Sequence, residues 1–376
     1  MNRALLRNTR KTDSLPVARL RLSPAHLRPP TAAFALLLML SGLLCWGAPK
    51  PIPVKVVVVT MFERGADAGD DPGEFQYWVE RLPLERVIPF PAGYRDLRYN
   101  PRTGVLGVVT GIGTAKAAAT IMALGLDPRF DFSHAYWVVA GIAGIDPLDG
   151  SLASAAWAEW VVDGDIGHEI DAREIPADWK TGYVPLRKST PYEMPLREPN
   201  EGEAYHLDAG LVEWAYQLTK TVPIPDTETI RARREQYDQP NARKAPFVLK
   251  GDTLSAGTFW HGKRMSEWAN DWVAYHTGGK GNYVTCAMED SGTLQSLTFL
   301  AKAGRVDVRR VLVLRAASNF DQQRPGLTAA ESLAETKIGK YGAFLPSLEA
   351  AFRVGRVVVD ELVTNWATYR DRVPSK

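Results

Sequence analysis

Residues 55–59 read KVVVV, and residues 105–109 and 136–140 read VLGVV and YWVVA. An apolar run that leaves no polar residue on either face is typical of a strand covered on both sides. Two further runs, at 157–162 and 311–316, have the same character, and helical patterns such as the Ala-rich residues 115–126 lie between the runs. Strands that alternate with helices predict an α/β fold, with a mixed, largely parallel central sheet flanked by helices.

The segment at 170–250 differs from the rest of the chain in composition. Prolines and charged residues are dense in it, and only residues 207–218 show apolar side chains at helical spacing. We expect this Pro-rich segment to be an insertion or cap on a single domain of residues 49–376, in preference to a second domain.

The N-terminal segment has the pattern of a secretory signal. Residues 1–30 carry seven basic side chains against the single acid Asp13, and an apolar run at 32–46 leads into Gly47 and Ala48. That run is shorter than the roughly 20 residues that a membrane-spanning helix needs. We therefore expect residues 1–48 to be a signal peptide with a basic leader. Export to the periplasm or the medium is favoured over a membrane anchor, with lipidation of Cys45 or a misassigned Met1 as alternatives.

The rest of the sequence argues against nucleic-acid binding, a membrane-spanning helix beyond residue 50 and a metal site. Lys and Arg total 45 against 43 for Asp and Glu, with no basic stripe carrying interleaved aromatic residues, so nucleic acid is not an expected partner. No run of 18 apolar residues occurs beyond residue 50, so no spanning helix is predicted there. The scattered histidines lack metal-ligand spacing, and we expect no metal.

Three segments place flexible or polar residues directly after a predicted strand, where ligands bind in open α/β sheets. They are TGIGT at 110–114, TCAMED at 285–290 and RAASN at 315–319. Glycines followed by a helix N-terminus let the backbone approach an anion. A carboxylate accepts hydrogen bonds from a diol, and an amide both donates and accepts. Each segment alone would also suit a tight turn or a helix cap.

Together these segments resemble the nucleoside phosphorylase and nucleosidase superfamily, above all its purine nucleosidases. The matching motifs are Thr110-Gly-Ile-Gly-Thr114, Gly141-Ile-Ala-Gly144 as a turn, Ser255-Ala-Gly-Thr-Phe259, Met288-Glu289 and Arg315-Ala-Ala-Ser-Asn319. With its N-terminal signal, its insertion and the segment GTFWHG at 257–262, the chain as a whole resembles the purine nucleoside permease family. The resemblance implies purine nucleoside uptake or salvage.

The resemblance also implies roles for individual residues. Met288 and Glu289 would hold the ribose, with Glu289 accepting from the 2′- and 3′-hydroxyls, and Phe259 would stack on the base. Ser318 and Asn319 would meet the N7 edge of the purine. Two glycines, Gly111 and Gly113, would line the place of phosphate or the attacking water. Glu63 is a candidate base, with a solvated loop acid as its alternative, and His261 could touch the substrate.

Two departures from the resemblance bear on the chemistry. The nucleosidases carry Asp where this chain has Asn319, and an amide has no proton to release to N7, although it can hydrogen-bond there. Many phosphorylases place a phosphate-binding Arg where residues 138–140 read VVA, although Arg64, Arg95 or Arg98 could substitute.

The sequence therefore predicts cleavage of the N-glycosidic bond of purine nucleosides, by water or by phosphate as co-substrate, with no other cofactor. Binding without catalysis, in support of a separate membrane transporter, remains the alternative. A homo-oligomer also stays open.

Overall fold

The computed structural model describes residues 50–191, 202–335 and 342–375. The valine run forms β2 (Val56–Thr60), in which every residue is buried. Its neighbours are β5 (Val105–Val109) and β7 (Tyr136–Ile145), and both run parallel to it. The prediction of a strand covered on both faces is confirmed. The predicted signal at residues 1–48 lies outside the described residues.

The longest strands, β7 and β16 (Val311–Phe320), form the centre of the sheet. They run parallel, and a register shift falls between Ala317 and Asn319. On the opposite edge of β7, residues 136–139 pair with β2, whereas residues 144–145 pair antiparallel with β15 (Tyr283–Ala287). Residues 140–143 of β7 pair with neither of these two strands along that edge. We call this stretch the β7 gap.

Within the described residues, twelve strands form one mixed sheet, in the order β12-β9-β14-β15-β7-β2-β5-β4-β3, with β16, β8 and β13 joined beside β7. Parallel and antiparallel pairs both occur, so the predicted fold class is confirmed. The strands not yet given bounds are β3 (Arg86–Ile88), β4 (Leu97–Asn100), β8 (Ala155–Ala158), β9 (Trp160–Asp163), β12 (Ala204–His206), β13 (Val248–Lys250) and β14 (Asp252–Ser255). Two small pairs stand outside this sheet: β1 (Ile52–Pro53) with β6 (Phe130–Asp131), and β10 (Gly167–Glu169) with β11 (Tyr183–Pro185).

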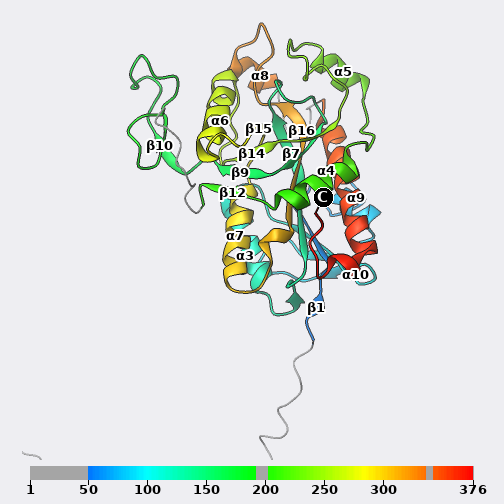
Figure 1. Cartoon of the computed structure of the whole chain (residues 1–376). Coiled ribbons are helices and arrows are strands. Elements are labelled where there is room, and N and C mark those ends of the chain that lie inside the picture. The colour runs from blue at the N-terminus through cyan, green and yellow to red at the C-terminus, as the bar shows by residue number, and fades with distance from the viewer. Residues whose placement is uncertain (1–49, 192–201, 336–341, 376) are drawn as a thin grey trace, which may run out of the picture. The chain divides into compact units, whose positions relative to one another are not determined.

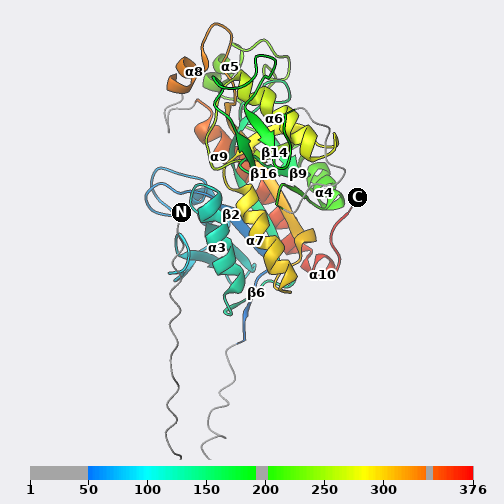
Figure 2. The same cartoon turned by 90° about the vertical axis from the view of Figure 1, so that its left-hand side faces the viewer.

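Helices cover both faces of the sheet (Figures 1 and 2). The helices α3 (Thr114–Leu126) and α7 (Asp290–Lys302) lie side by side on one face, and α9 (Phe344–Thr364) packs on β7 and β16 from the other. The remaining helices are α2 (Gln76–Arg81), α4 (Ala209–Thr219), α5 (Glu228–Arg234), α6 (Lys263–His276), α8 (Ala329–Glu335), α10 (Trp366–Tyr369) and a 3₁₀ turn at Val308–Arg310. In the described part of the chain, no helix combines the length and apolar character needed to cross a membrane.

The segment at 170–250 is built into the sheet rather than laid over it. Strand β12 pairs with β9 and strand β13 pairs with β8, so parts of the segment extend or complete the sheet. Between them, α4 buries Leu211, Val212 and Ala215 in the main apolar core. Strand β11 instead pairs with β10 in a hairpin outside the sheet, beyond α6 (Figure 1).

The contact between α3 and α7 depends on a glycine. A Cβ atom placed on Gly292 would lie well inside 3.0 Å of the backbone oxygen of Thr114, a separation that real Cβ atoms do not adopt. Gly292 therefore lets the start of α7 approach the start of α3, and this contact positions the turn at residues 110–114.

We predict that Gly292→Ala destabilises the protein by about 1–3 kcal/mol, because overpacking against backbone outweighs the better helix propensity of alanine. Phe299→Ala on the exposed side of the same helix is the control, and it should change stability by roughly 0.5 kcal/mol or less. Urea unfolding of the two variants measures this. Equal stability of Gly292→Ala and the parent would contradict the packing argument.

Candidate functional site

The site is built around a buried arginine. Arg315 on β16 is 1% exposed, and its guanidinium makes a two-point ion pair with the fully buried Asp290 at the start of α7. Its Nε lies 3.0 Å from Asp290 Oδ2 and its Nη2 lies 2.5 Å from Oδ1. A charge this deep is tolerated only where paired carboxylates and hydrogen bonds replace water. Arg315 thereby ties the central strand to α7.

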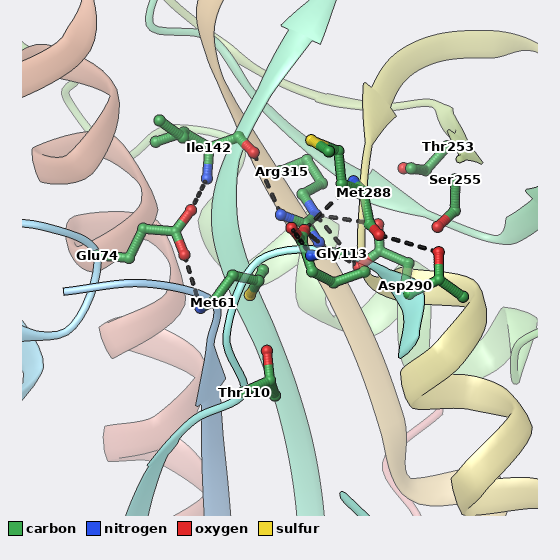
Figure 3. A network of polar contacts seen from close by, with 12 residues as sticks. Met61, Glu74, Thr110, Gly113, Ile142, Thr253, Ser255, Met288, Asp290 and Arg315 are labelled. Atoms are coloured by element: carbon green, nitrogen blue, oxygen red, sulfur yellow. Dashed lines mark hydrogen bonds and ion pairs between the residues drawn. The ribbon is translucent and has the colours of Figure 1, made fainter. Parts of the chain in front are cut away.

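Arg315 and Glu74 together close the β7 gap (Figure 3). The backbone N–H of Ile142 donates to Glu74 Oε1 at 2.7 Å, and Arg315 Nη1 donates to the carbonyl of Ile142 at 3.2 Å. Glu74 Oε2 accepts from the backbone N–H of Met61, directly after β2, at 2.8 Å. Two side chains thus replace the hydrogen bonds that a neighbouring strand would supply.

Gly141 makes room for this arrangement. A Cβ atom at Gly141 would lie 2.6 Å from Glu74 Oε1 and 2.7 Å from Arg315 Nη1, so the two side chains meet over a residue without one. The resemblance implied that residues 141–144 form a turn, but they lie within strand β7. Their glycines serve close side-chain approach instead of chain reversal.

Glu289 brings the predicted glycine turn into the same cluster. Its Oε1 accepts from the backbone N–H of Gly113 at 3.1 Å, and its Oε2 accepts from Arg315 Nη2 at 3.3 Å. The hydroxyl of Thr114 donates to the carbonyl of Met288 at 3.1 Å. Gly111 and Gly113 have φ values of 84° and 99°, which favour glycine. The structure therefore brings together Gly113, Met288 and Glu289, which were predicted from two separate motifs.

The cluster holds more acid than base. Arg315 faces Asp290, Glu289 and Glu74, and all of these side chains are buried. Burial raises the pKa of Glu74 to about 8, against the lowering effect of Arg315, and the charge of Glu289 raises it further. Burial also raises the pKa of Glu289, although Arg315 opposes this. Burial thus favours the protonated form of Glu74 more than that of an exposed glutamate.

Ser318 and Asn319 line a small pocket with a volume of about 30 Å³. The Ser318 hydroxyl lies within hydrogen-bond distance of the carbonyl of Ala143, at 3.1 Å, and of Asn319 Oδ1, at 2.9 Å. Asn319 Nδ2 donates to the carbonyl of Phe320 at 3.0 Å. Ser318 and Arg315 therefore contact the carbonyls of two neighbouring residues of β7, Ala143 and Ile142.

Phe259 lies apart from these residues. Its ring is 45% exposed, and it does not line the pocket that holds Asn319. The stacking role inferred from the resemblance stays a prediction that this geometry does not support.

Glu63 occupies a different place from the one predicted for a catalytic base. Its carboxylate accepts backbone N–H groups from Arg64, Gly73, Phe75 and Gln76. These bonds close the loop between β2 and α2, and they leave the carboxylate turned toward that loop. Glu74 is the acid that faces Arg315, and its role was missed. The signal for it was a glutamate two residues before helix α2.

The three arginines proposed as phosphate ligands already have partners. Arg64 pairs with Asp71 at 2.8 Å, while Arg95 and Arg98 share Asp67 at 2.9 and 2.8 Å. In the described part of the chain, no group of three or more His, Cys, Asp or Glu side chains could hold a metal ion.

A mixed sheet flanked by helices, with polar side chains gathered where its strands end, defines an α/β protein of the ligand-binding kind. The sequence profile of the purine nucleoside permease family matches residues 53–374, and the chain belongs to that family. The predicted family is confirmed.

Two similar proteins come from yeasts. A probable purine nucleoside permease of Schizosaccharomyces pombe is 28% identical over 322 residues, covering 83% of this chain and 90% of the relative. A purine nucleoside permease of Candida albicans is 26% identical over 327 residues, covering 84% and 77%.

Solved structures with distant likeness include a nucleosidase and a hydrolase. A 5′-methylthioadenosine/S-adenosylhomocysteine nucleosidase of Helicobacter pylori has a TM-score of 0.48 at 15% identity, covering 83% of this chain and all of that one. Futalosine hydrolase of the same organism has a TM-score of 0.48 at 14% identity, covering 82% and 98%. These likenesses are too distant to transfer residue roles.

The raised pKa of Glu74 predicts a pH dependence of stability. An acid whose pKa is higher in the folded state stabilises the fold below its unfolded pKa, and this contribution is lost as the pH rises through the folded value. The free energy of unfolding should therefore fall between about pH 5 and pH 8, by up to about 1.4 kcal/mol per pH unit from this one proton.

Glu74→Gln should reduce that slope, and Glu85→Gln, at an exposed position, should keep it. Urea unfolding at pH 5, 6, 7 and 8 gives the slopes for the three proteins. Parallel curves for the parent and Glu74→Gln would contradict the assignment of the proton to Glu74.

Proposed function

We propose that this protein binds purine nucleosides and cleaves their N-glycosidic bond with water. The observation that carries the proposal is the pair of buried carboxylates, Glu289 and Glu74, held around Arg315 at the β7 gap. The ligand class, purine nucleosides, comes from the names of the relatives. The proposed cleavage rests on the two carboxylates.

Glu289 would hold the ribose. Gly113 donates to its Oε1, while Met288 and Arg315 both donate to its Oε2, so Oε1 keeps capacity for a further hydrogen bond. A cis-diol presents two adjacent donors to such an acceptor. The fixed orientation means that little entropy is lost when the sugar binds.

Glu74 is the candidate base for the attacking water. In its ionised form it would take a proton as the water oxygen bonds to C1′ and the bond from C1′ to the base breaks. A pKa of about 8 keeps the group able to exchange a proton near neutral pH. The backbone N–H groups of Met61 and Ile142 stabilise the carboxylate form when the proton leaves.

Asn319 would assist the departure of the base without protonating it. Its amide lies on β16, the strand that carries Arg315, and a hydrogen bond to N7 would stabilise the negative charge that develops there. Water is favoured over phosphate because Arg64, Arg95 and Arg98 are paired with acids, and Arg315 is committed to Asp290. A phosphate would have to displace one of these carboxylates.

The second candidate is binding without cleavage. It is favoured by one observation, that the side chain at the purine N7 position is an amide with no proton to release. In that case the protein would capture nucleosides outside the cytoplasm, after export directed by residues 1–48, and deliver them to a separate transporter.

Incubation of the purified protein with inosine or adenosine, with and without phosphate, tests the main proposal. We expect release of free base without phosphate, a rate that phosphate does not increase, and loss of about 100-fold or more in Glu74→Gln, the size of a general-base contribution. The control Glu85→Gln should keep the parent rate. Tight binding with no base released would favour the second candidate.

Glu289→Gln tests the ribose assignment. Replacing a charged acceptor that is bonded to a diol should weaken inosine binding by roughly tenfold to a hundredfold, while the affinity for hypoxanthine changes little. Glu85→Gln, at an exposed position, is the control. It should change the affinity for neither inosine nor hypoxanthine. Equal losses for the two ligands in Glu289→Gln would sink the assignment.

A further inference from the structure

A larger pocket is lined by α6, the β10–β11 hairpin and the loop that follows β14. Its volume is about 180 Å³, against about 30 Å³ for the pocket of Asn319. This is less than the roughly 300–1,000 Å³ of pockets for drug-sized ligands, so it suits a compact molecule. None of the described residues that line it belongs to the cluster around Arg315 or to the pocket of Asn319. The proposed nucleoside site therefore does not account for this pocket.

Three tryptophans form the buried part of the lining. Trp260, Trp268 and Trp272 are 9%, 4% and 3% exposed. The ring centroid of Trp268 lies 5.9 Å from that of Trp260 and 5.5 Å from that of Trp272. Tyr183 of β11 also lines the pocket, and its ring centroid lies 4.6 Å from that of Trp268. These contacts hold the rings in place, so little side-chain entropy is lost when a ligand binds.

The acidic side chains of the lining lie at its exposed end. Asp165 and Glu169 are both exposed. Asp165 Oδ2 accepts from the backbone N–H of Gly257 at 2.6 Å, which orients this carboxylate. His168 lines the same end, and among the described residues no lysine or arginine lines the pocket. A cavity with two carboxylates and neither of these cations raises the local concentration of positively charged ligands.

Aromatic rings and carboxylates together favour an organic cation. The face of an aromatic ring, of tryptophan above all, attracts a cation. A metal ion would need several oxygen or nitrogen ligands, and in the described part of the chain no group of three or more His, Cys, Asp or Glu side chains could hold one. An ammonium with N–H groups would leave some of them without acceptors against the rings. A quaternary ammonium has no N–H group to satisfy.

We propose that this pocket binds a small quaternary ammonium cation. Its alkyl groups would lie against the three tryptophans and Tyr183, and its charge would be balanced by Asp165 and Glu169. The protein would then bind two ligands of different chemistry at two sites. The proposal goes beyond the proposed function and does not depend on it, because the two sites share no residue.

Calorimetric titration with choline tests the proposal, and the control ligand is the neutral alcohol in which carbon replaces the choline nitrogen. We expect choline to bind about tenfold or more tightly than this alcohol, because the rings and the carboxylates attract the charge and the two molecules have the same shape. Inosine should not displace choline. Equal affinity for the two ligands, or no binding of choline at about 10 mM, would overturn the proposal. Displacement by inosine would place the cation in the nucleoside site and overturn it as well.

Substitutions in the lining locate the cation. Tyr183→Leu removes a ring face and should weaken choline binding about fivefold or more, while Tyr183→Phe keeps the ring and should stay within about twofold of the parent. The double variant Asp165→Asn, Glu169→Gln should also lose about fivefold or more, because it removes both charges. Asp271→Asn, at an exposed position of α6 outside the lining, should keep the parent affinity. Equal losses in the two Tyr183 variants, or parent affinity in the double variant, would contradict the proposed site.

Discussion

The ion pair between Arg315 and Asp290 is the interaction on which the rest of the structure depends. Arg315 lies on the central strand and Asp290 begins α7, so one pair links the sheet to the helix that carries the neighbouring Glu289. Removing one partner of a buried ion pair leaves the other charge buried without a partner, which typically destabilises the fold by about 3–5 kcal/mol. The same guanidinium then reaches Glu289 and the carbonyl of Ile142. Stability and site geometry are therefore set by one side chain.

The β7 gap explains why this chemistry gathers at one place. Two parts of the sheet meet on β7 without a shared neighbour strand, so β2 ends before β15 begins. Backbone groups left at such a break need partners, and here Glu74 and Arg315 supply them. Carboxylates thus enter the interior of the sheet because its unpaired backbone groups need partners. The hydroxyl of Ser318 contacts the carbonyl of Ala143, one residue further along β7.

Much of the fold could be predicted because its signals are local. The valine run of β2 has one environment in any α/β sheet, and Gly113 and Glu289 each follow a strand end, where ligand sites gather. The same rule led to the prediction of Glu63 as the base, because Glu63 closely follows the end of β2. The structure instead uses Glu63 to hold the backbone of the next loop.

Other features depend on contacts between residues far apart in the sequence. Glu74 reaches β7 because the loop at 64–73 returns the chain to the sheet, and nothing in the local pattern of that loop indicates where it ends. The strands of the Pro-rich segment are three residues long, and their pairing with β8 and β9 gives them their conformation. Gly141 was predicted to lie in a turn. Its actual role, to let Glu74 and Arg315 approach closely, involves side chains from two other parts of the chain and so leaves no local signal.

A crystal structure of the Glu74→Gln variant with inosine tests the central claim most directly, because slowed cleavage leaves the nucleoside whole. The account predicts the two ribose hydroxyls within hydrogen-bond distance of Glu289 and the N7 edge of the purine facing Asn319. Inosine bound elsewhere, with Glu289 and Arg315 out of its reach, would contradict the account.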